Sequence, residues 1–207
     1  MQKCILEGNN RLIVLIGTDE TDKYRQKYQN ETLLFIYDFD WNSCLSPWPA
    51  QKVFRKGEDF AGGADAFISE LIPAVSEVRD RFHIETAVIA GYSLAGLFSL
   101  YLCTKTDLFD GAVSASGSLW YPDFTEYLRQ HPVRCGTVYL SLGDREKLSK
   151  SPVMSTVEDK TKAAFEIISG YCTAVFEMNP GGHFADEAER TEKGIDWVLK
   201  QQAYLVQ

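Results

Sequence analysis

Short apolar runs alternate along the chain with longer segments in which apolar residues recur every three or four positions. An uninterrupted apolar run of about four to eight residues is typical of a strand buried on both faces of a parallel sheet. The sequence therefore predicts a series of buried strands and a possible edge strand at Cys4–Glu7. The buried strands are predicted at Leu12–Ile16, Leu33–Tyr37, Ala87–Ala90, Ala112–Ala115, Thr137–Leu142 and Ala174–Glu177.

The longer segments predict helices that pack one face on the sheet. Apolar residues from Phe67 to Phe82 follow one another at spacings of three and four, which places them on one helical stripe. Because strands and helices alternate, we expect a mostly parallel α/β sheet with helices on both faces. No linker or repeat divides the chain, so a single domain over residues 1–207 is predicted. Further helices are predicted at Leu94–Thr104, Phe124–Arg129, Thr156–Ser169 and Ala185–Gln202.

Polar residues follow several of the predicted strands. In open α/β sheets, ligands bind outside the carboxyl ends of the strands. His83 and His131 precede strands and therefore fall at the opposite edge, so the pattern selects His183 among the histidines. The groups at the carboxyl edge are Asp40-Trp41-Asn42, Ser93, Asp144 and His183.

The segment Gly91-Tyr92-Ser93-Leu94-Ala95 joins a predicted buried strand to a predicted apolar helix. A serine at such a junction lies on a sharp turn that exposes its hydroxyl above the sheet. Gly91 and Ala95 are small enough for the strand and the helix to approach closely. We therefore predict that Ser93 is a nucleophile, the alternative being a residue of tight packing or a helix cap.

A serine hydroxyl needs a base to take its proton, and the imidazole of His183 is suited to that task near neutral pH. The chain order Ser93, Asp144, His183 is the order of a hydrolase triad on an α/β sheet. Asp144 is therefore the predicted acid. Gly143-Asp144-Arg145-Glu146 can also be a solvated turn in which Asp144 pairs with an arginine, which leaves Glu146 or Glu158 as the alternative.

Two backbone N–H groups are needed to bind the oxyanion of an acyl-transfer reaction. Leu94 follows the nucleophile at a helix N-terminus, and the loop after the strand Leu33–Tyr37 offers Trp41 as the second donor. Aromatic residues gather in the loops at the same edge, as is typical of a small-molecule site. The predicted substrate-binding residues are Asp40, Trp120, Tyr121 and Phe184.

Net charge, the N-terminal apolar run and the cysteines indicate which partners, location and cofactors to expect. A net charge of −8 disfavours nucleic acid and anionic membranes as partners. The apolar run near the N-terminus is too short to span a bilayer and does not resemble a signal peptide, so a cytoplasmic location is predicted. The five cysteines are dispersed and form no metal-binding motif, so we expect packing roles for Cys103 and Cys172, and no metal or organic cofactor.

The segment from Gly91 to Leu97 resembles the nucleophile segment of the esterase group of α/β-hydrolases that includes esterase D, enterochelin-type siderophore esterases and feruloyl esterases. Further blocks of that group are similar to Asp40-Trp41-Asn42, Ser46-Pro47-Trp48-Pro49, Gly62-Gly63-Ala64-Asp65-Ala66-Phe67, Ser116-Gly117-Ser118-Leu119-Trp120-Tyr121, Leu142-Gly143-Asp144 and Gly182-His183. The resemblance implies hydrolysis of carboxylic esters through an acyl-serine, with Ser93 as nucleophile and His183 as base. Some relatives use glutamate as the acid.

No insertion between the predicted strands is long enough for a cap domain, so we expect an open site bordered by Asn42–Gly62 and Glu146–Thr156. The predicted function is a hydrolase of small or medium carboxylic esters, with a small-molecule ester as its partner. Two alternatives stay open: a non-catalytic binding or scaffold protein on a hydrolase fold, and an acyltransferase or thioesterase with the same residues. The oligomeric state is not determined by the sequence.

Overall fold

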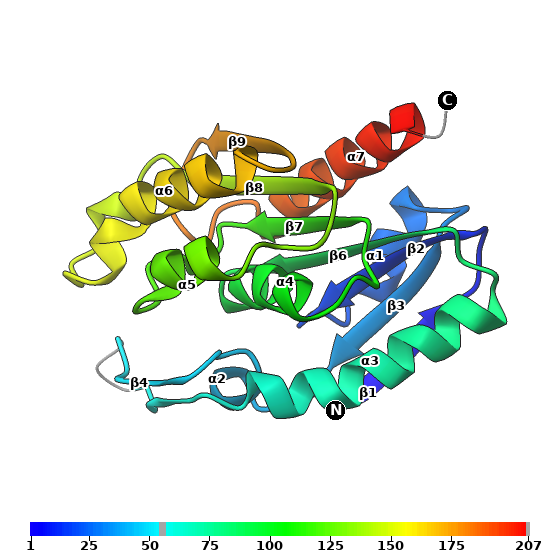
Figure 1. Ribbon diagram of the computed structural model, residues 1–207, viewed down its shortest axis with the longest axis horizontal. Coiled ribbons are helices and arrows are strands. Elements are labelled where there is room, and N and C mark those ends of the chain that lie inside the picture. The colour runs from blue at the N-terminus through cyan, green and yellow to red at the C-terminus, as the bar shows by residue number, and fades with distance from the viewer. Residues whose placement is uncertain (54–56, 206–207) are drawn as a thin grey trace.

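The computed structural model describes residues 1–53 and 57–205 and is built around one large, mostly parallel sheet (Figure 1). Its strand order is β1-β3-β2-β6-β7-β8-β9. β1 runs antiparallel to β3, and each further pair of neighbours is parallel. The strands are β1 Gln2–Leu6, β2 Arg11–Ile16, β3 Thr32–Tyr37, β6 Thr86–Tyr92, β7 Gly111–Ala115, β8 Thr137–Gly143 and β9 Thr173–Asn179.

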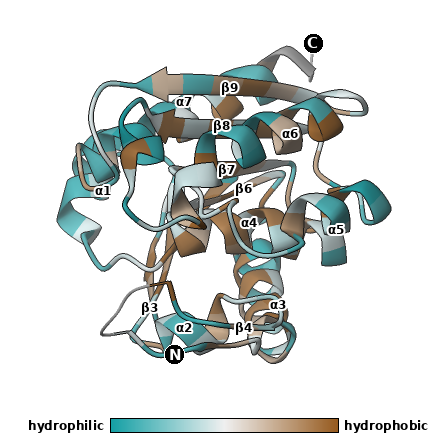
Figure 2. Ribbon diagram, turned by 90° about the vertical axis from the view of Figure 1, so that its left-hand side faces the viewer, coloured by the Kyte–Doolittle hydropathy of each residue, from teal (hydrophilic) through white to brown (hydrophobic). Residues whose placement is uncertain are grey.

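Helices cover both faces of the sheet, as predicted (Figures 1 and 2). On one face, α1 (Thr21–Lys27) and α7 (Glu187–Leu205) pack on alternate residues of β2, β3 and β6. On the other face lie α3 (Ala64–Arg81), α4 (Leu94–Lys105), α5 (Phe124–Gln130) and α6 (Val157–Ser169). Because the strands are apolar on both faces, each layer of helices closes its own hydrophobic core.

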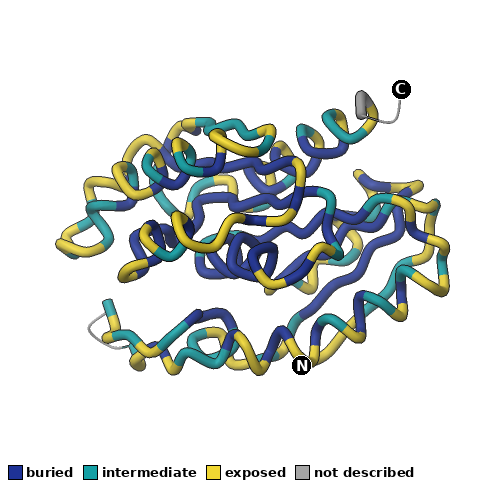
Figure 3. Tube along the Cα trace, in the orientation of Figure 1, coloured by how far each residue is buried: buried dark blue, intermediate teal, exposed yellow. Residues whose placement is uncertain are grey.

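α4 is the most deeply enclosed of these helices, since residues 94 to 104 are all buried (Figure 3). Apolar residues surround this helix instead of forming a stripe, which is the pattern of a helix buried on every side. The helix that follows Ser93 is therefore fixed by packing along its whole length. Among the described helices none is long and apolar enough to cross a membrane.

The predicted strands and helices are confirmed, with ends that differ by a few residues. The predicted edge strand Cys4–Glu7 begins and ends earlier, as β1. The last helix begins at Glu187 instead of Ala185, because Asp186 has a φ of 54° and interrupts the helical backbone.

The structure also contains short elements that were not predicted, because each is too short to show a periodic apolar pattern. Two of them carry residues of the predicted site: α2 begins at Trp41, and the single turn η1 begins at Glu146. The short elements are α1, α2 (Trp41–Cys44), β4 (Pro49–Ala50), β5 (Phe60–Ala61), η1 (Glu146–Leu148) and η2 (Met154–Thr156).

The sheet has a point at which the strand order reverses. From β2 the chain moves outward to β3 and then crosses to the other side of β2, where it forms β6. Such a reversal leaves a crevice at the carboxyl ends of the two strands. β2 and β6 pair in parallel with Ile16 opposite Gly91, so the residues after Ile16 lie beside the residues around Ser93.

Candidate active site

Ser93 occupies the sharp turn between β6 and α4. Its backbone has a φ of 59° and a ψ of −122°, an unfavourable conformation for a residue with a side chain. The turn is enforced by close packing, because a Cβ on Gly91 would lie 2.3 Å from the carbonyl oxygen of Ala95. The amides of Gly96 and Leu97 donate to the carbonyl oxygen of Ser93, which secures the first turn of the helix.

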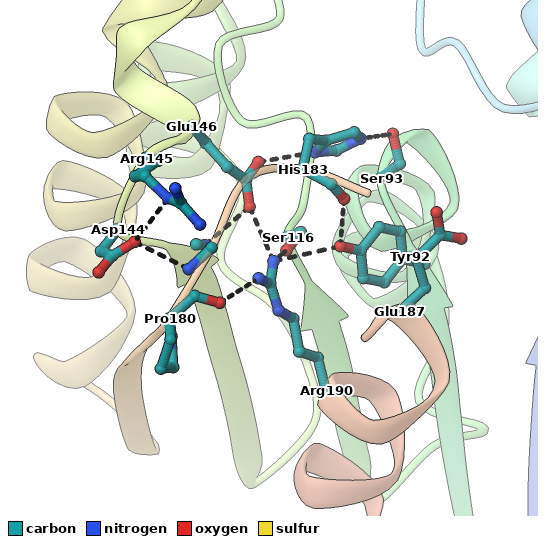
Figure 4. Close-up of polar contacts among 12 residues, drawn as sticks. Tyr92, Ser93, Ser116, Asp144, Arg145, Glu146, Pro180, His183, Glu187 and Arg190 are labelled. Atoms are coloured by element: carbon teal, nitrogen blue, oxygen red, sulfur yellow. Dashed lines mark hydrogen bonds and ion pairs between the residues drawn. The ribbon is translucent and has the colours of Figure 1, made fainter. Parts of the chain in front are cut away.

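The imidazole of His183 lies against this serine. Its Nε2 atom is 2.9 Å from Oγ of Ser93, although the two residues are 90 positions apart in the chain (Figure 4). His183 lies in the glycine-rich turn after β9, where Gly181 has a φ of 103°. The predicted contact between Ser93 and His183 is present, with a ring nitrogen of the histidine within hydrogen-bond distance of the serine hydroxyl.

The carboxylate beside His183 belongs to Glu146, and the prediction of Asp144 was wrong in this respect. Nδ1 of His183 is 2.6 Å from Oε2 of Glu146, in a contact whose side chains are 19% and 4% exposed. Of the alternatives, Glu158 pairs instead with Lys147 and Lys162.

Asp144 lies in the same turn but points away from the histidine (Figure 4). Its Oδ1 atom accepts from the amide of Gly181 at 2.9 Å, and its side chain is 57% exposed. Among the hydrogen bonds of the described residues, none joins Asp144 to His183. The backbone enters η1 between these two carboxylates, which turns Glu146 inward and leaves Asp144 at the surface.

A buried arginine lies behind Glu146, and the sequence reasoning did not identify it. Arg190 of α7 is 1% exposed, and its Nη1 atom is 3.2 Å from Oε1 of Glu146. A signal for its burial exists in the sequence, because Arg190, Gly194 and Val198 fall at intervals of four on the stripe of α7 that faces the sheet. An arginine on the buried stripe of a helix indicates buried polar partners, since an arginine is rarely buried without them.

The amides of Leu94 and Trp41, the predicted oxyanion donors, both lie at the start of a helix. Leu94 is the first residue of α4, and the first amides of a helix have no acceptor within the helix. Trp41 is likewise the first residue of α2, and it lines two cavities together with Ser93. The loop after β2 supplies another candidate for the second donor, Thr18, because β2 lies directly beside β6 in the sheet.

Three cavities reach His183, and two of them also reach Ser93. The largest, about 620 Å³, lies at the ends of β2 and β6 and between α1 and α7, and its lining includes Tyr24 and Thr191. A second cavity of about 470 Å³ contains His183 and lies under the segment from Leu148 to Met154. A third, of about 120 Å³, includes Ser93, Leu94 and Trp41. Together they provide room for a small molecule beside Ser93 and His183.

The predicted borders of the site are confirmed where the structure describes them. Val53 and Glu58 come from the segment 42–62, and Leu148 and Met154 come from the segment 146–156. Residues 54–56 of the first border lie outside the described residues. Part of this border is apolar and exposed, since 68% of Leu148 is accessible to solvent.

The predicted substrate-binding residues divide into two pairs. Trp120 lines both smaller cavities, and Phe184 is 81% exposed between the two larger ones. Tyr121 instead is buried in the core, where its hydroxyl donates to the carbonyl oxygen of Trp48. Asp40 is the N-cap of α2, since its carboxylate accepts from the amide of Ser43 at 2.8 Å. Tyr121 and Asp40 therefore shape the loops and do not line these cavities.

The thiols lie apart from this site. Cys103 is fully buried, and a hydrogen bond to Cys135 together with burial raises the pKa of its thiol well above the usual range. Burial also raises the pKa of Cys172, to about 12. Both thiols are therefore kept protonated, as expected of packing residues.

Within the described part of the chain, no cluster of three or more His, Cys, Asp or Glu side chains is arranged to hold a metal ion.

Comparison with known proteins places the fold. No protein-family model matches the chain, and no curated protein is similar to it in sequence. Solved structures do match: an IroE-like serine hydrolase from Shewanella oneidensis has a TM-score of 0.75 at 14% identity, over 91% of this chain and 69% of the other.

Two further structures are named as esterases or hydrolases of siderophores. The siderophore hydrolase EstA from Aspergillus nidulans matches with a TM-score of 0.64 at 17% identity, over 92% of this chain and 82% of its own. The enterobactin esterase FES from Shigella flexneri matches with a TM-score of 0.64 at 20% identity, over 97% of this chain and 56% of its own. The chain therefore has an α/β-hydrolase fold, shared with proteins named as serine hydrolases and esterases.

Proposed function

We propose that the protein is a serine hydrolase that cleaves carboxylic esters of small or medium size through an acyl-serine intermediate. The observation that carries the proposal is the continuous chain of hydrogen bonds from Ser93 through His183 to Glu146. A nucleophile, a base and a carboxylate that orients the base are the parts that acyl transfer requires. The open cavities beside Ser93 and His183 support a small-molecule ester as the substrate.

The first half of the reaction forms the acyl-enzyme. Nε2 of His183 takes the proton from Oγ of Ser93 while the oxygen attacks the ester carbonyl. The oxyanion accepts hydrogen bonds from the amide of Leu94 and from a second amide, of Trp41 or Thr18. When the tetrahedral intermediate collapses, the ester C–O bond breaks and His183 returns its proton to the departing alcohol.

Water completes the cycle. His183 takes a proton from water, the hydroxide attacks the acyl carbonyl, and Ser93 leaves with the proton that His183 returns. In both halves the carboxylate of Glu146 accepts from Nδ1 of His183, which fixes the tautomer and stabilises the imidazolium. Glu146 therefore takes the role that the sequence assigned to Asp144.

The similar structures support the fold of this chain and do not determine its substrate. The similar structures include siderophore hydrolases, but at 14 to 20% identity they share the fold only. Ester hydrolysis is proposed because the site of this chain supports it. The contact between Ser93 and His183 argues against a non-catalytic scaffold. Acyl transfer to an acceptor other than water uses the same residues and is separated by experiment. The cytoplasmic location, and the absence of nucleic-acid and membrane partners, stay predictions from the sequence.

The proposal is tested with a fluorophosphonate probe and a panel of p-nitrophenyl esters, naphthyl esters and thioesters. Wild-type protein is expected to label at Ser93 and to hydrolyse esters, and Ser93→Ala should lower kcat by about 10³-fold or more. Ser99→Ala is the matched control, because Ser99 lies on the same helix and bonds only to the carbonyl oxygen of Ala95. Adding acceptor alcohols detects acyl transfer.

Two results would contradict the proposal. A folded protein that never labels at Ser93 favours the scaffold alternative, and ester hydrolysis that survives Ser93→Ala excludes the acyl-serine mechanism.

A further inference from the structure

The guanidinium of Arg190 connects the ends of several strands at the centre of the site (Figure 4). Its Nη1 atom is 2.9 Å from Oγ of Ser116, which follows β7, and 3.3 Å from the hydroxyl of Tyr92 at the end of β6. The same atom is 3.2 Å from Glu146, which follows β8. Nη2 donates at 2.8 Å to the carbonyl oxygen of Pro180, which follows β9.

These contacts determine the direction of the Glu146 carboxylate. Oε1 accepts from the amide of Gly143 at 2.7 Å and from Arg190 at 3.2 Å. Oε2 is thereby left for Nδ1 of His183. A planar guanidinium can contact acceptors on several elements at once, which a lysine ammonium on its flexible stem does less well.

The arginine also acts on the turn that carries the histidine. Arg190 binds the carbonyl of Pro180, three residues before His183, and contacts the hydroxyl of Tyr92. That hydroxyl donates to the carbonyl oxygen of His183 at 2.5 Å. The backbone on both sides of the imidazole is therefore linked to the same buried side chain.

We propose that Arg190 is a positioning residue for the hydrolysis: it directs one oxygen of Glu146 at His183 and anchors the turn that presents the imidazole to Ser93. The buried guanidinium of Arg190 lies 3.2 Å from the buried carboxylate of Glu146 and pairs with its charge. Arg190 and Glu146 therefore stay within one hydrogen-bonded cluster throughout the reaction. This inference rests on the proposed function, and it adds a residue that no resemblance or sequence motif assigned.

The central experiment is a double-mutant cycle that combines Arg190→Met with Glu146→Gln. If Arg190 acts through Glu146, Arg190→Met lowers kcat by roughly 10- to 100-fold in the wild type, by analogy with residues that orient ligands of a site. In the Glu146→Gln background the same change should lower kcat by clearly less than in the wild type, because only the anchoring of the turn at Pro180 is then lost. KM should change little, because Arg190 lines none of the cavities found at the site.

Loss of folded protein is separated from loss of positioning in two ways. Rates are expressed per serine that labels with the fluorophosphonate, at a temperature well below the melting transition of every variant. Arg25→Met is the matched control, because Arg25 also binds backbone carbonyls, those of Tyr28, Gln29, Glu31 and Glu7, but lies away from the site. Arg25→Met should lower the melting temperature and leave kcat per labelled site unchanged. Arg190→Lys should fall between the wild type and Arg190→Met.

A spectroscopic readout tests the inference without turnover. The hydrogen bond between Nδ1 of His183 and Glu146 is short, so its proton should give a low-field NMR signal in the wild type. We expect this signal to be absent in Glu146→Gln, shifted or broadened in Arg190→Met, and unchanged in Arg25→Met.

The failures of the two proposals are distinguishable. Equal losses of kcat from Arg190→Met in both backgrounds, or an unchanged low-field signal in that variant, would overturn the positioning role and leave the hydrolase intact. A protein that hydrolyses no ester but shows the expected change of signal would overturn the hydrolase function alone.

Discussion

Ser93 and the pair His183–Glu146 are held in place in different ways. Ser93 lies between two regular elements, in a turn where the steric limit at Gly91 is set by Ala95, four positions along the chain. His183 and Glu146 both lie in surface turns, and the contact between them joins residues 37 positions apart. The contact between Glu146 and Arg190 spans 44 positions.

The part of the site formed by His183 and Glu146 depends more on contacts between distant elements than the turn at Ser93 does. The turn at Ser93 is preserved as long as β6 and α4 pack on each other, because steric limits at Gly91 leave few alternatives. The direction of Glu146 depends instead on hydrogen bonds supplied by other elements. Substitutions of the residues that support Ser93 should therefore act mainly on stability, and substitutions of the residues that support His183 should act mainly on catalytic rate.

Among the residues that support His183, the largest effect on catalytic rate is expected for Glu146→Gln. Removing the charge that stabilises the imidazolium should lower kcat by about 10³-fold or more with little change in KM. Asp144→Asn is the matched control and should change kcat by less than about threefold, because its side chain points away from His183 and can still accept from the Gly181 amide. Steady-state kinetics on one p-nitrophenyl ester decides the matter. A larger loss for Asp144→Asn than for Glu146→Gln would contradict the assignment.

A smaller effect, on stability, is expected for Gly91→Ala. The added methyl group would lie 2.3 Å from a backbone oxygen of α4, so strand and helix must move apart, at a cost of about 1–3 kcal/mol or more. Gly182→Ala, in the turn before His183, is the matched control. No atom lies within 4 Å of a Cβ at Gly182, so its stability should be near that of the wild type.

Urea unfolding of both glycine variants, with fluorophosphonate labelling of the folded protein, measures this difference. Equal destabilisation by the two substitutions would show that the turn at Ser93 is no more constrained than the turn at His183.

The smallest effect is expected for Tyr92→Phe, which removes the hydrogen bond to the carbonyl of His183. Burial raises the pKa of Tyr92, so the hydroxyl keeps its proton at the neutral pH of an ester assay. Loss of this one bond, about 1 kcal/mol, should lower kcat by roughly three- to tenfold. Tyr171→Phe is the control, since that hydroxyl accepts from the amide of Val133 away from the site. An unchanged kcat for Tyr92→Phe would show that Pro180 and the other contacts suffice to place His183.

Much of the fold could be predicted from the sequence, because hydrophobic periodicity is a local property. Buried strands such as β2 and β8 are continuous apolar runs, and α3 shows a regular apolar stripe. The order of strands and helices also placed Ser93 and His183 at one edge of the sheet and left His83 and His131 at the other. To select His183 over His83 and His131, it was enough to know which of them follows a strand.

The sequence by itself selected Ser93 and His183, because each is marked by the strand that precedes it. Only the tertiary structure decided which carboxylate serves the histidine, that Tyr121 packs in the core, and that Asp40 caps α2. Asp144 and Glu146 are two residues apart in one turn, where no periodicity fixes the direction of a side chain. Their orientations follow from hydrogen bonds to Gly181 and Arg190, and such long-range partners come together only when the chain has folded.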